Sequence, residues 1–424
     1  MEVLLGRIGG AGGSPRVVAI SVGRTPCAQN EPKGGFSLDH SPARSLRRRR
    51  HHQQMRSAAD ASSRWSGSEP RSSHPSMLTV ALVFIAVLWT SAFIVFSLGA
   101  ELLAWDVRFA YLPAADAILD GRSPYPDLDD PILEDQKGYV YPPQLAVALL
   151  PLTTLPIDLV ALVVTAGMLA MLFVTLRLLS VRDVRCYAAA VLWMPVASGL
   201  LLANISIPLA LALAVVWRYR DRVRQPAVAL GFAVSAKLLL WPLFVWTLAT
   251  RRLRTTLWAL AIGLFVTFVA WAAIGFDGLG GYLDLLRRLS DIQSENSYSI
   301  VGMASTLGLS DAVGQGLTVV VGGGLLVACV VLARRGDELR SFTCAVAATL
   351  ALSPIVWLHY LVLLLVPLAI ARPRFSIIWL LPILLWTSPR PGYAEGFQTF
   401  LPAIAAAILV GMLLVRPPLR QQPA

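Results

Sequence analysis

Residues 100–143 carry the side chains of this chain that are best suited to chemistry. Nine of them are acidic and three are basic, and strongly apolar segments precede and follow the stretch. The acids are Glu101, Asp106, Asp116, Asp120, Asp127, Asp129, Asp130, Glu134 and Asp135. A long acidic loop between two apolar spans predicts polar chemistry at a membrane surface.

Asp106 is the candidate general base. It follows Trp105 directly where the first apolar segment ends, with Phe109 and Tyr111 close behind it. A carboxylate sheltered by aromatic rings holds its proton more tightly than usual, which suits it to take a proton from a hydroxyl group. The alternative interpretation is that Asp106 simply marks the end of a span.

The other acids of the loop favour a solvated surface. Asp116 and Asp120 are four residues apart on a helix predicted over Pro113–Leu119, so both are expected to face water. Asp129 and Asp130, together with the acids at 134 and 135, could bind a cation, but their spacing matches no ligand pattern. We therefore predict no metal site.

Two further candidates lie in apolar surroundings. Lys237, in VSAKLLLWP, has no charged neighbour, and an intramembrane lysine is costly unless it meets an anion or a cavity. His359 is the only histidine beyond residue 76. The alternatives are a lysine that extends to the membrane surface and a histidine satisfied in the core. With Asn204 and the polar run 293–299, both are expected on the same side of the membrane as Asp106.

The composition indicates a polytopic membrane protein. Of the 424 residues 56% are hydrophobic and 14% charged, and the mean hydropathy is +0.64. The net charge of +11 does not argue for nucleic acid, because arginines in cytoplasmic loops explain it equally well. The four cysteines have neither metal nor redox spacing, so we predict no disulfide and no zinc site.

Two regions are expected. Residues 1–76 are rich in Gly, Ser, Arg and Pro, which predicts a disordered basic cytoplasmic tail, with Met77 as an alternative start of the chain. Residues 77–420 are expected to form an all-α transmembrane bundle of about twelve apolar segments, some short or re-entrant. The segments lie at 78–99, 156–179, 186–202, 206–217, 226–237, 239–250, 256–275, 313–333, 341–355, 359–371, 375–387 and 397–415.

Arginine clusters follow every second segment. They are Arg177/Arg182/Arg185, Arg218/Arg220/Arg222/Arg224, Arg251/Arg252/Arg254, Arg334/Arg335/Arg340, Arg372/Arg374 and Arg416/Arg420. Since basic loops stay on the cytoplasmic side, both termini are expected inside a multi-pass plasma-membrane protein. The loops 100–143, 276–312 and 388–396 then lie outside, and YLDLLRRL in the second of them predicts a helix at the interface.

The chain resembles glycosyltransferase family 87, of the GT-C superfamily. WDVRFAYLPAADAILDGRSPYPD followed by YVYPPQLAVALLPL is similar to the first outer loop of that family, with Asp106, Gly121–Tyr125 and Tyr141-Pro142-Pro143 at the family's positions. Lys237 followed by Pro242, ENSYSIVG at 295–302 and SPIVWLHY at 353–360 extend the likeness over most of residues 78–415. Two departures are Leu202-Ala203, where members often have Gly-Gln, and His359-Tyr360, where they often have paired histidines.

The resemblance implies a GT-C-type membrane enzyme. Such enzymes transfer mannose or arabinofuranose from a polyprenyl-phosphate donor to a lipid-linked or envelope glycan outside the cell, with inversion, and they need no nucleotide sugar. We expect no cofactor, although the acids at 127–135 leave metal dependence open. The resemblance implies that Asp106 is the general base and that Lys237, with Arg108 or Arg287 and Arg288, neutralises the phosphate. The remaining implied contacts are His359, Asn204 and Asn296 for the donor and Tyr125 and Tyr141 for the acceptor.

Two other functions fit the apolar composition. A transporter or flippase could use Lys237 and His359 as intramembrane polar sites, but this leaves the acidic loop without a role. A scaffold for envelope assembly would tolerate the loss of both residues and of Asp106. We expect the transferase, with a polyprenyl-phosphate sugar, a glycan or glycolipid and membrane lipid as its partners and no nucleic acid.

Overall fold

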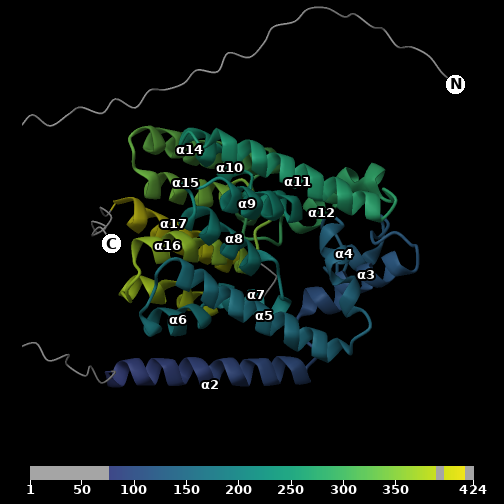
Figure 1. The fold of residues 1–424 in the computed structure, drawn as a ribbon, viewed down its shortest axis with the longest axis horizontal. Coiled ribbons are helices and arrows are strands. Elements are labelled where there is room, and N and C mark those ends of the chain that lie inside the picture. The colour runs from purple at the N-terminus through teal and green to yellow at the C-terminus, as the bar shows by residue number, and fades with distance from the viewer. Residues whose placement is uncertain (1–75, 388–395, 416–424) are drawn as a thin grey trace, which may run out of the picture. The chain divides into compact units, whose positions relative to one another are not determined.

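The computed structural model describes residues 76–387 and 396–415, and within these ranges every regular element is helical. The predicted tail 1–76 lies outside them except for Ser76, as does the loop 388–396 except for Gly396. The prediction of an all-α fold is confirmed for the described residues. Figure 1 shows the order and arrangement of their helices.

Helix α2, Met77–Gly99, begins where the Ser76 hydroxyl accepts a hydrogen bond from the Thr79 N–H. Capping of this kind satisfies an amide that has no partner within its own helix. Most of its side chains are apolar and exposed, which in a membrane means contact with lipid. The Trp89 ring stacks on Phe93 and meets the edge of Trp386, so one face of α2 is fixed to the bundle.

Within residues 76–387 and 396–415, four helices are long and apolar enough to cross a membrane. They are α2, α5 (Ile157–Leu178), α11 (Leu253–Ala273) and α14 (Asp311–Arg334). A fifth candidate is the pair α6 (Val184–Val191) and α7 (Met194–Leu202), which is bent by 62°. Five shorter helices of the described residues, each 10–17 residues long, are also apolar: Ser206–Arg218, Leu238–Ala249, Leu358–Ala371, Ile377–Thr387 and Phe400–Val415. The protein is therefore a helical membrane protein.

Glycines and aromatic rings set the packing of the bundle. Helices α9 (Arg224–Ala236) and α11 approach so closely that a Cβ at Gly231 would lie 2.8 Å from the Ala259 carbonyl oxygen. The Phe342 ring of α15 (Glu338–Ala351) lies 5.0 Å from Trp217 of α8 (Ser206–Arg218) and 5.1 Å from Trp246 of α10 (Pro242–Ala249). These buried rings join three helices that are distant in the sequence.

Short helices gather at one end of the bundle. There the acidic loop folds into η1 (Val107–Tyr111), α3 (Leu112–Leu119), η2 (Pro131–Leu133) and α4 (Gln144–Leu149), beside α12 (Tyr282–Gln293) (Figure 1). The helix predicted at Pro113–Leu119 is confirmed, with Asp116 and Asp120 exposed. The helix predicted around YLDLLRRL is α12.

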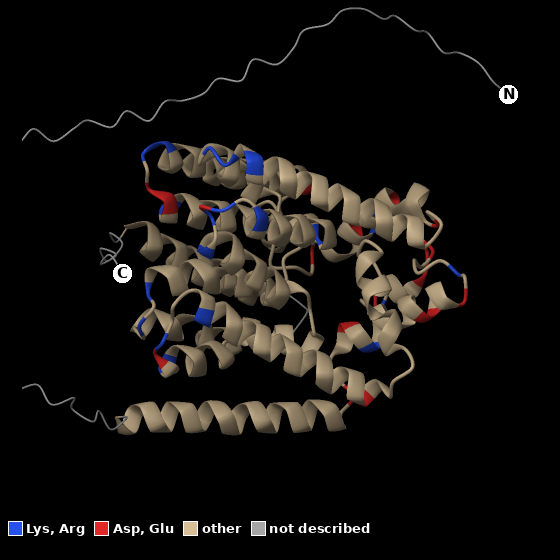
Figure 2. Cartoon of the chain, in the orientation of Figure 1, with Lys and Arg blue, Asp and Glu red and all other residues tan. Residues whose placement is uncertain are grey.

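Basic and acidic side chains gather at opposite ends of the bundle (Figure 2). Lys and Arg gather where α14 turns into α15, and Asp and Glu gather around α3 and α12 (Figure 2). At the basic end, Glu338 forms ion pairs with both Arg220 and Arg252, and the first has a separation of 2.9 Å. This bridge ties the start of α15 to the end of α8 and the start of α11.

Candidate active site

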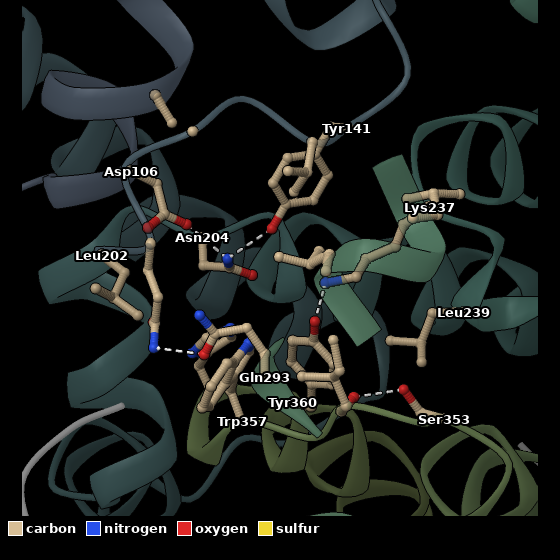
Figure 3. Close-up of a pocket in the computed structure, with 18 of the residues that line it drawn as sticks. Asp106, Tyr141, Leu202, Asn204, Lys237, Leu239, Gln293, Ser353, Trp357 and Tyr360 are labelled. Atoms are coloured by element: carbon tan, nitrogen blue, oxygen red, sulfur yellow. Dashed lines mark hydrogen bonds between the residues drawn. The ribbon is translucent and has the colours of Figure 1, made fainter. Parts of the chain in front are cut away.

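A cavity of about 810 Å³ lies at the acidic end of the bundle. Its wall includes the start of η1, the α7–α8 junction, the break after α9, one face of α12 and the residues that lead from α15 into η6 (Leu358–Leu364). Five residues singled out from the sequence line it together: Asp106, Tyr141, Asn204, Lys237 and His359. Figure 3 shows four of these, with Tyr360 beside Lys237.

Asp106 lies on the cavity wall, immediately before η1. Its Oδ2 accepts hydrogen bonds from the Tyr111 hydroxyl at 3.2 Å and from Asn204 Nδ2 at 2.7 Å. No hydrogen bond to Oδ1 occurs among the described residues. Burial raises the pKa of Asp106 to about 6, against the opposing effects of Asn204, Tyr111 and the charge of Lys237. The carboxylate can thus take up a proton near neutral pH.

Asn204 lies between the base and a tyrosine. Helix α7 ends at Ala203, which has a left-handed backbone (φ 52°), and this turn places Asn204 just before α8. The Nδ2 group donates to Asp106 and, at 3.1 Å, to the Tyr141 hydroxyl. Asn204 Oδ1 accepts from the backbone N–H and the hydroxyl of Ser206. Asp106 and Asn204 are therefore joined although 98 positions separate them in the sequence.

Lys237 lies where α9 breaks. The backbone at Lys237 is extended, and Pro242 at the start of α10 has no N–H with which to continue a helix. Its Nζ donates to the Tyr360 hydroxyl and lies 3.9 Å from the Tyr360 ring centroid and 5.2 Å from that of Tyr141. Among residues 76–387 and 396–415, Lys237 forms no ion pair. An ammonium group in this aromatic setting can accept an anionic ligand.

His359 is only 3% exposed and lines the same cavity. Neither ring nitrogen has a hydrogen-bond partner in the part of the chain that the structure describes. A buried imidazole without a partner is costly, because both nitrogens have lost water. A ligand in the cavity can supply the missing hydrogen bond.

Tyrosines build the wall behind these groups. The Tyr111 and Tyr141 rings meet edge to face with centroids 5.3 Å apart, and Tyr139 donates to the Pro142 carbonyl at 2.6 Å. Tyr125 does not line the cavity; its hydroxyl donates to the Tyr141 carbonyl at 3.2 Å. Tyr282 donates in the same way to Val140. The predicted acceptor residue Tyr125 thus holds the backbone of Tyr141 in place.

Other predicted residues lie outside the cavity. Arg108 binds the Leu103 carbonyl at 2.7 Å and pairs with Asp158, and Asn296 is exposed. Of the two loop arginines, Arg287 pairs with Asp284, and Arg288 donates to the Leu128 carbonyl. None of these four lines the wall.

Sequence reasoning missed one glutamine of the wall, Gln136, whose partner Gln293 also lines the cavity. Gln136 Nε2 donates to Gln293 Oε1 at 3.2 Å, and Gln293 Nε2 donates to the Leu133 carbonyl at 3.2 Å. These bonds fix α12 against the acidic loop. The polar run at 293–299 marked Gln293, but nothing in the pattern pointed to Gln136 as its partner. Within the described ranges, no group of three or more His, Cys, Asp or Glu side chains could hold a metal ion.

Comparison with known proteins agrees with the membrane fold. Residues 139–354 match the sequence profile of glycosyltransferase family 87, a range that contains Tyr141, Asn204 and Lys237 but not Asp106 or His359. A curated relative in Mycolicibacterium smegmatis is 26% identical over 339 residues, covering 74% of this chain and 75% of the relative. It is named as a polyprenol-phosphate-mannose-dependent alpha-(1-2)-phosphatidylinositol pentamannoside mannosyltransferase. No solved structure matches.

The family match covers half of the chain and includes three of the cavity residues, Tyr141, Asn204 and Lys237. The relative aligns with three quarters of both proteins and carries out the glycosyl transfer that the family name describes. The chain belongs to glycosyltransferase family 87 and is a membrane glycosyltransferase.

Proposed function

We propose that the enzyme transfers a mannosyl unit from a polyprenyl-phosphate donor to a hydroxyl group of a lipid-linked or cell-envelope glycan. The observation that carries the proposal is one cavity lined both by Asp106 and by Lys237. Among the described residues, Asp106 Oδ1 accepts no hydrogen bond and Lys237 forms no ion pair. The transfer needs a proton acceptor and a cation for the departing phosphate. The donor named for the mycobacterial relative supports polyprenyl-phosphate mannose.

In the proposed reaction, the acceptor hydroxyl attacks the anomeric carbon from the face opposite the phosphate. A carbon–oxygen bond forms there as the bond to the phosphate oxygen breaks, which inverts the configuration. Asp106 Oδ1 takes the hydroxyl proton, and polyprenyl phosphate leaves with the bonding electron pair. With a pKa of about 6, roughly nine tenths of the Asp106 carboxylate is ionised at pH 7.

Lys237 is proposed to bind the departing phosphate. Its ammonium group is held over the Tyr141 and Tyr360 rings and has no carboxylate partner among the described residues. His359 lies on the same wall, and neither of its ring nitrogens has a partner in the described part of the chain, so it can contact a phosphate oxygen or the sugar. Arg108 and Asn296 do not face the cavity and are left out of this contact set. No cofactor is needed, because the phosphate is already the leaving group.

We infer a topology with the acidic end outside the cell. The basic loops lie at the opposite end of the bundle (Figure 2), and such loops stay in the cytoplasm. This orientation places the cavity at the extracytoplasmic face of the plasma membrane. It also suits about twelve crossing or re-entrant segments, of which four to five are long enough to span unaided.

The test compares wild-type protein with Asp106→Asn in membranes supplied with radiolabelled polyprenyl-phosphate mannose. Transfer of label to lipid or glycan by the wild type, and its loss by at least about 100-fold in the variant, is the expected result. Asp120→Asn, an exposed acid of the same loop, is the matched control and should keep full activity. Equal transfer by wild type and Asp106→Asn would exclude Asp106 as the base. No transfer from an intact donor by the wild type would exclude mannose as the sugar.

A further inference from the structure

The hydrogen-bonding capacity of Asn204 is fully used inside the protein. An asparagine side chain offers two N–H donors and one carbonyl oxygen with two lone pairs. The two donors go to Asp106 Oδ2 and the Tyr141 hydroxyl, at 2.7 Å and 3.1 Å. The carbonyl oxygen receives the Ser206 N–H at 3.1 Å and the Ser206 hydroxyl at 2.9 Å. A sugar or phosphate could bind Asn204 only by displacing one of these partners.

Ser206 determines which end of the amide faces the base. A backbone N–H can only donate, so the atom opposite it must be the carbonyl oxygen of Asn204. Rotating the amide by half a turn would set its NH₂ group against the Ser206 N–H and its oxygen against the Asp106 carboxylate. Ser206 is fully buried and Asn204 is 2% exposed, so water has little access to relieve the contact between the NH₂ group and the Ser206 N–H.

The anchor is part of the rigid bundle, whereas the base belongs to the loop. Ser206 is the first residue of α8, and Asn204 follows the left-handed turn at Ala203 that ends α7. Asp106 belongs to the loop after α2, and its Oδ2 is held on one side by Asn204 and on the other by Tyr111. Both bonds end on Oδ2. The second oxygen, Oδ1, is left for the acceptor hydroxyl.

We propose that Asn204 is a positioning residue for Asp106 rather than a contact for the donor, and that Ser206 holds the Asn204 amide in its donating orientation. The pair selects Oδ1 as the oxygen that takes the proton and stabilises the carboxylate form of the base. This inference rests on the proposed role of Asp106 as general base. It gives Asn204 a different role from the donor contact that the family resemblance implies.

Four groups with a charge or a titrating proton surround this arrangement. Lys237 favours the ionised base through its charge, and Tyr111 does so through its hydrogen bond. Tyr141 and Tyr360 complete the set around the carboxylate. None of the four is changed in the variants below, so a shift in the titration of Asp106 reports on the Asn204 contact.

The experiment measures steady-state kinetics with polyprenyl-phosphate mannose between pH 4.5 and 8.5. In Asn204→Ala, kcat should fall about 10- to 100-fold with little change in the donor KM, because a hydrogen bond to a charged group is lost. The acidic limb of the kcat profile should move up by about one to two pH units, since the carboxylate has lost a donor. Ser206→Ala should show the same changes at smaller size, and Ser206→Thr, which keeps the hydroxyl, should restore the wild-type profile.

Ser341→Ala is the matched control, because Ser341 is an equally buried serine whose hydroxyl, among the described residues, bonds to Cys329 alone. It should lower the thermal midpoint without moving the pH profile. A raised donor KM in Asn204→Ala with an unmoved acidic limb would overturn the proposal in favour of a donor contact. A wild-type profile in a folded Ser206→Ala protein would overturn the contribution of the Ser206 hydroxyl to the anchor, because this variant keeps the backbone N–H bond to Asn204. If Asn204→Ala fails to fold, the pH profiles of Ser206→Ala and Ser206→Thr test the positioning of Asp106 in its place.

A readout that does not need turnover separates this inference from the proposed function. The carboxyl infrared band of Asp106, identified by difference from Asp106→Asn, titrates near pH 6 in the wild type if burial raises its pKa to about 6. Its midpoint should rise by about one to two units in Asn204→Ala. That shift without any sugar transfer would refute the reaction and leave the positioning intact. Sugar transfer by the wild type, with no shift of the band in Asn204→Ala, would support the reaction and refute the positioning role of Asn204.

Discussion

The Nζ atom of Lys237 lies 5.2 Å from the ring centroid of Tyr141. The hydroxyl of the same tyrosine meets Asn204 Nδ2, which also donates to Asp106. One run of contacts thus joins the proposed phosphate-binding cation to the proposed base. The two groups are held on one wall at fixed separation, which suits an acceptor and a leaving group on opposite sides of one anomeric carbon.

The ionisation of Asp106 predicts how the rate depends on pH. Because burial raises its pKa to about 6, the carboxylate should be protonated and inactive at pH 5 and ionised and active above pH 7. On the acidic limb, kcat should therefore increase with pH and reach half its maximum near pH 6. Burial lowers the pKa of Lys237 to about 7 and so sets an alkaline limb. Initial rates at saturating donor, measured from pH 4.5 to 8.5, give the midpoint. A rate that is flat across this range would contradict the assignment of the base.

Removing the charge of Lys237 should weaken the binding of the phosphate. In Lys237→Met the long side chain can still pack between Tyr141 and Tyr360, but the anion has lost its cation. We expect inhibition by the product polyprenyl phosphate to weaken about 10- to 100-fold, the size of a lost hydrogen bond to a charged group. Measuring the inhibition constant isolates this binding from the chemical step.

A second lysine provides the control for this substitution. Lys137 pairs with Asp135 at 3.1 Å in the acidic loop, and its side chain does not line the cavity. Lys137→Met should leave product inhibition unchanged. Equal weakening in both variants would mean that the net charge of the outer face, not Lys237 itself, attracts the phosphate.

The chemistry-bearing residues could be predicted where a polar group interrupts an apolar pattern. Asp106, Lys237 and His359 each stand out in this way, and the structure places all three on one cavity. Amphipathic spacing likewise predicted α12. The local sequence pattern was sufficient in these cases, because the residues that form the pattern are the same few residues that form the structural element.

The partners of these residues could not be predicted, because they depend on the tertiary fold. Nothing near Asn204 in the sequence indicates that its amide meets Asp106, or that Gln136 meets Gln293 across 157 positions. The segment Leu358–Leu364 shows the same limit for the spans. It is apolar like a transmembrane helix, yet it is buried within the bundle rather than facing lipid. An apolar run alone does not distinguish the two environments.

Gly278 tests whether the tyrosine wall must be held in place. Its φ of +76° favours glycine, and a Cβ there would lie 2.7 Å from Tyr125 Cδ2. Gly278→Ala should strain the turn and push Tyr125 away from the Tyr141 carbonyl. We expect a loss of about 1–2 kcal/mol in the free energy of unfolding, together with reduced kcat. Thermal unfolding in detergent measures the change in stability, and initial rates at one fixed pH measure the change in kcat.

The control for this change lies two residues away. A Cβ at Gly280 would meet nothing within 4 Å, and its φ is not in the left-handed region. Gly280→Ala should therefore leave both stability and rate close to wild type. An unaltered rate in Gly278→Ala would show that the site tolerates displacement of Tyr125.

Glu338 tests the opposite end of the bundle, where charge should matter for stability and not for chemistry. It bridges Arg220 and Arg252, and all three side chains are less than 30% exposed. Glu338→Gln leaves two partly buried arginines that repel each other across a neutral amide, although Arg252 keeps its ion pair with Asp221. We expect a loss of about 1–2 kcal/mol in unfolding free energy, between the values for exposed and buried pairs.

The kinetic constants of Glu338→Gln should remain those of the wild type, because neither arginine lines the cavity. Asp120→Asn is the comparison, since the Asp120–Arg122 pair is about two-thirds exposed on both sides and should contribute little. Thermal midpoints report the loss of stability and the donor KM reports any change at the cavity, and both are measured on the same preparations. A changed KM in a folded Glu338→Gln protein would mean that the basic end of the bundle is coupled to the cavity, and that the helices between them do not act as a rigid support.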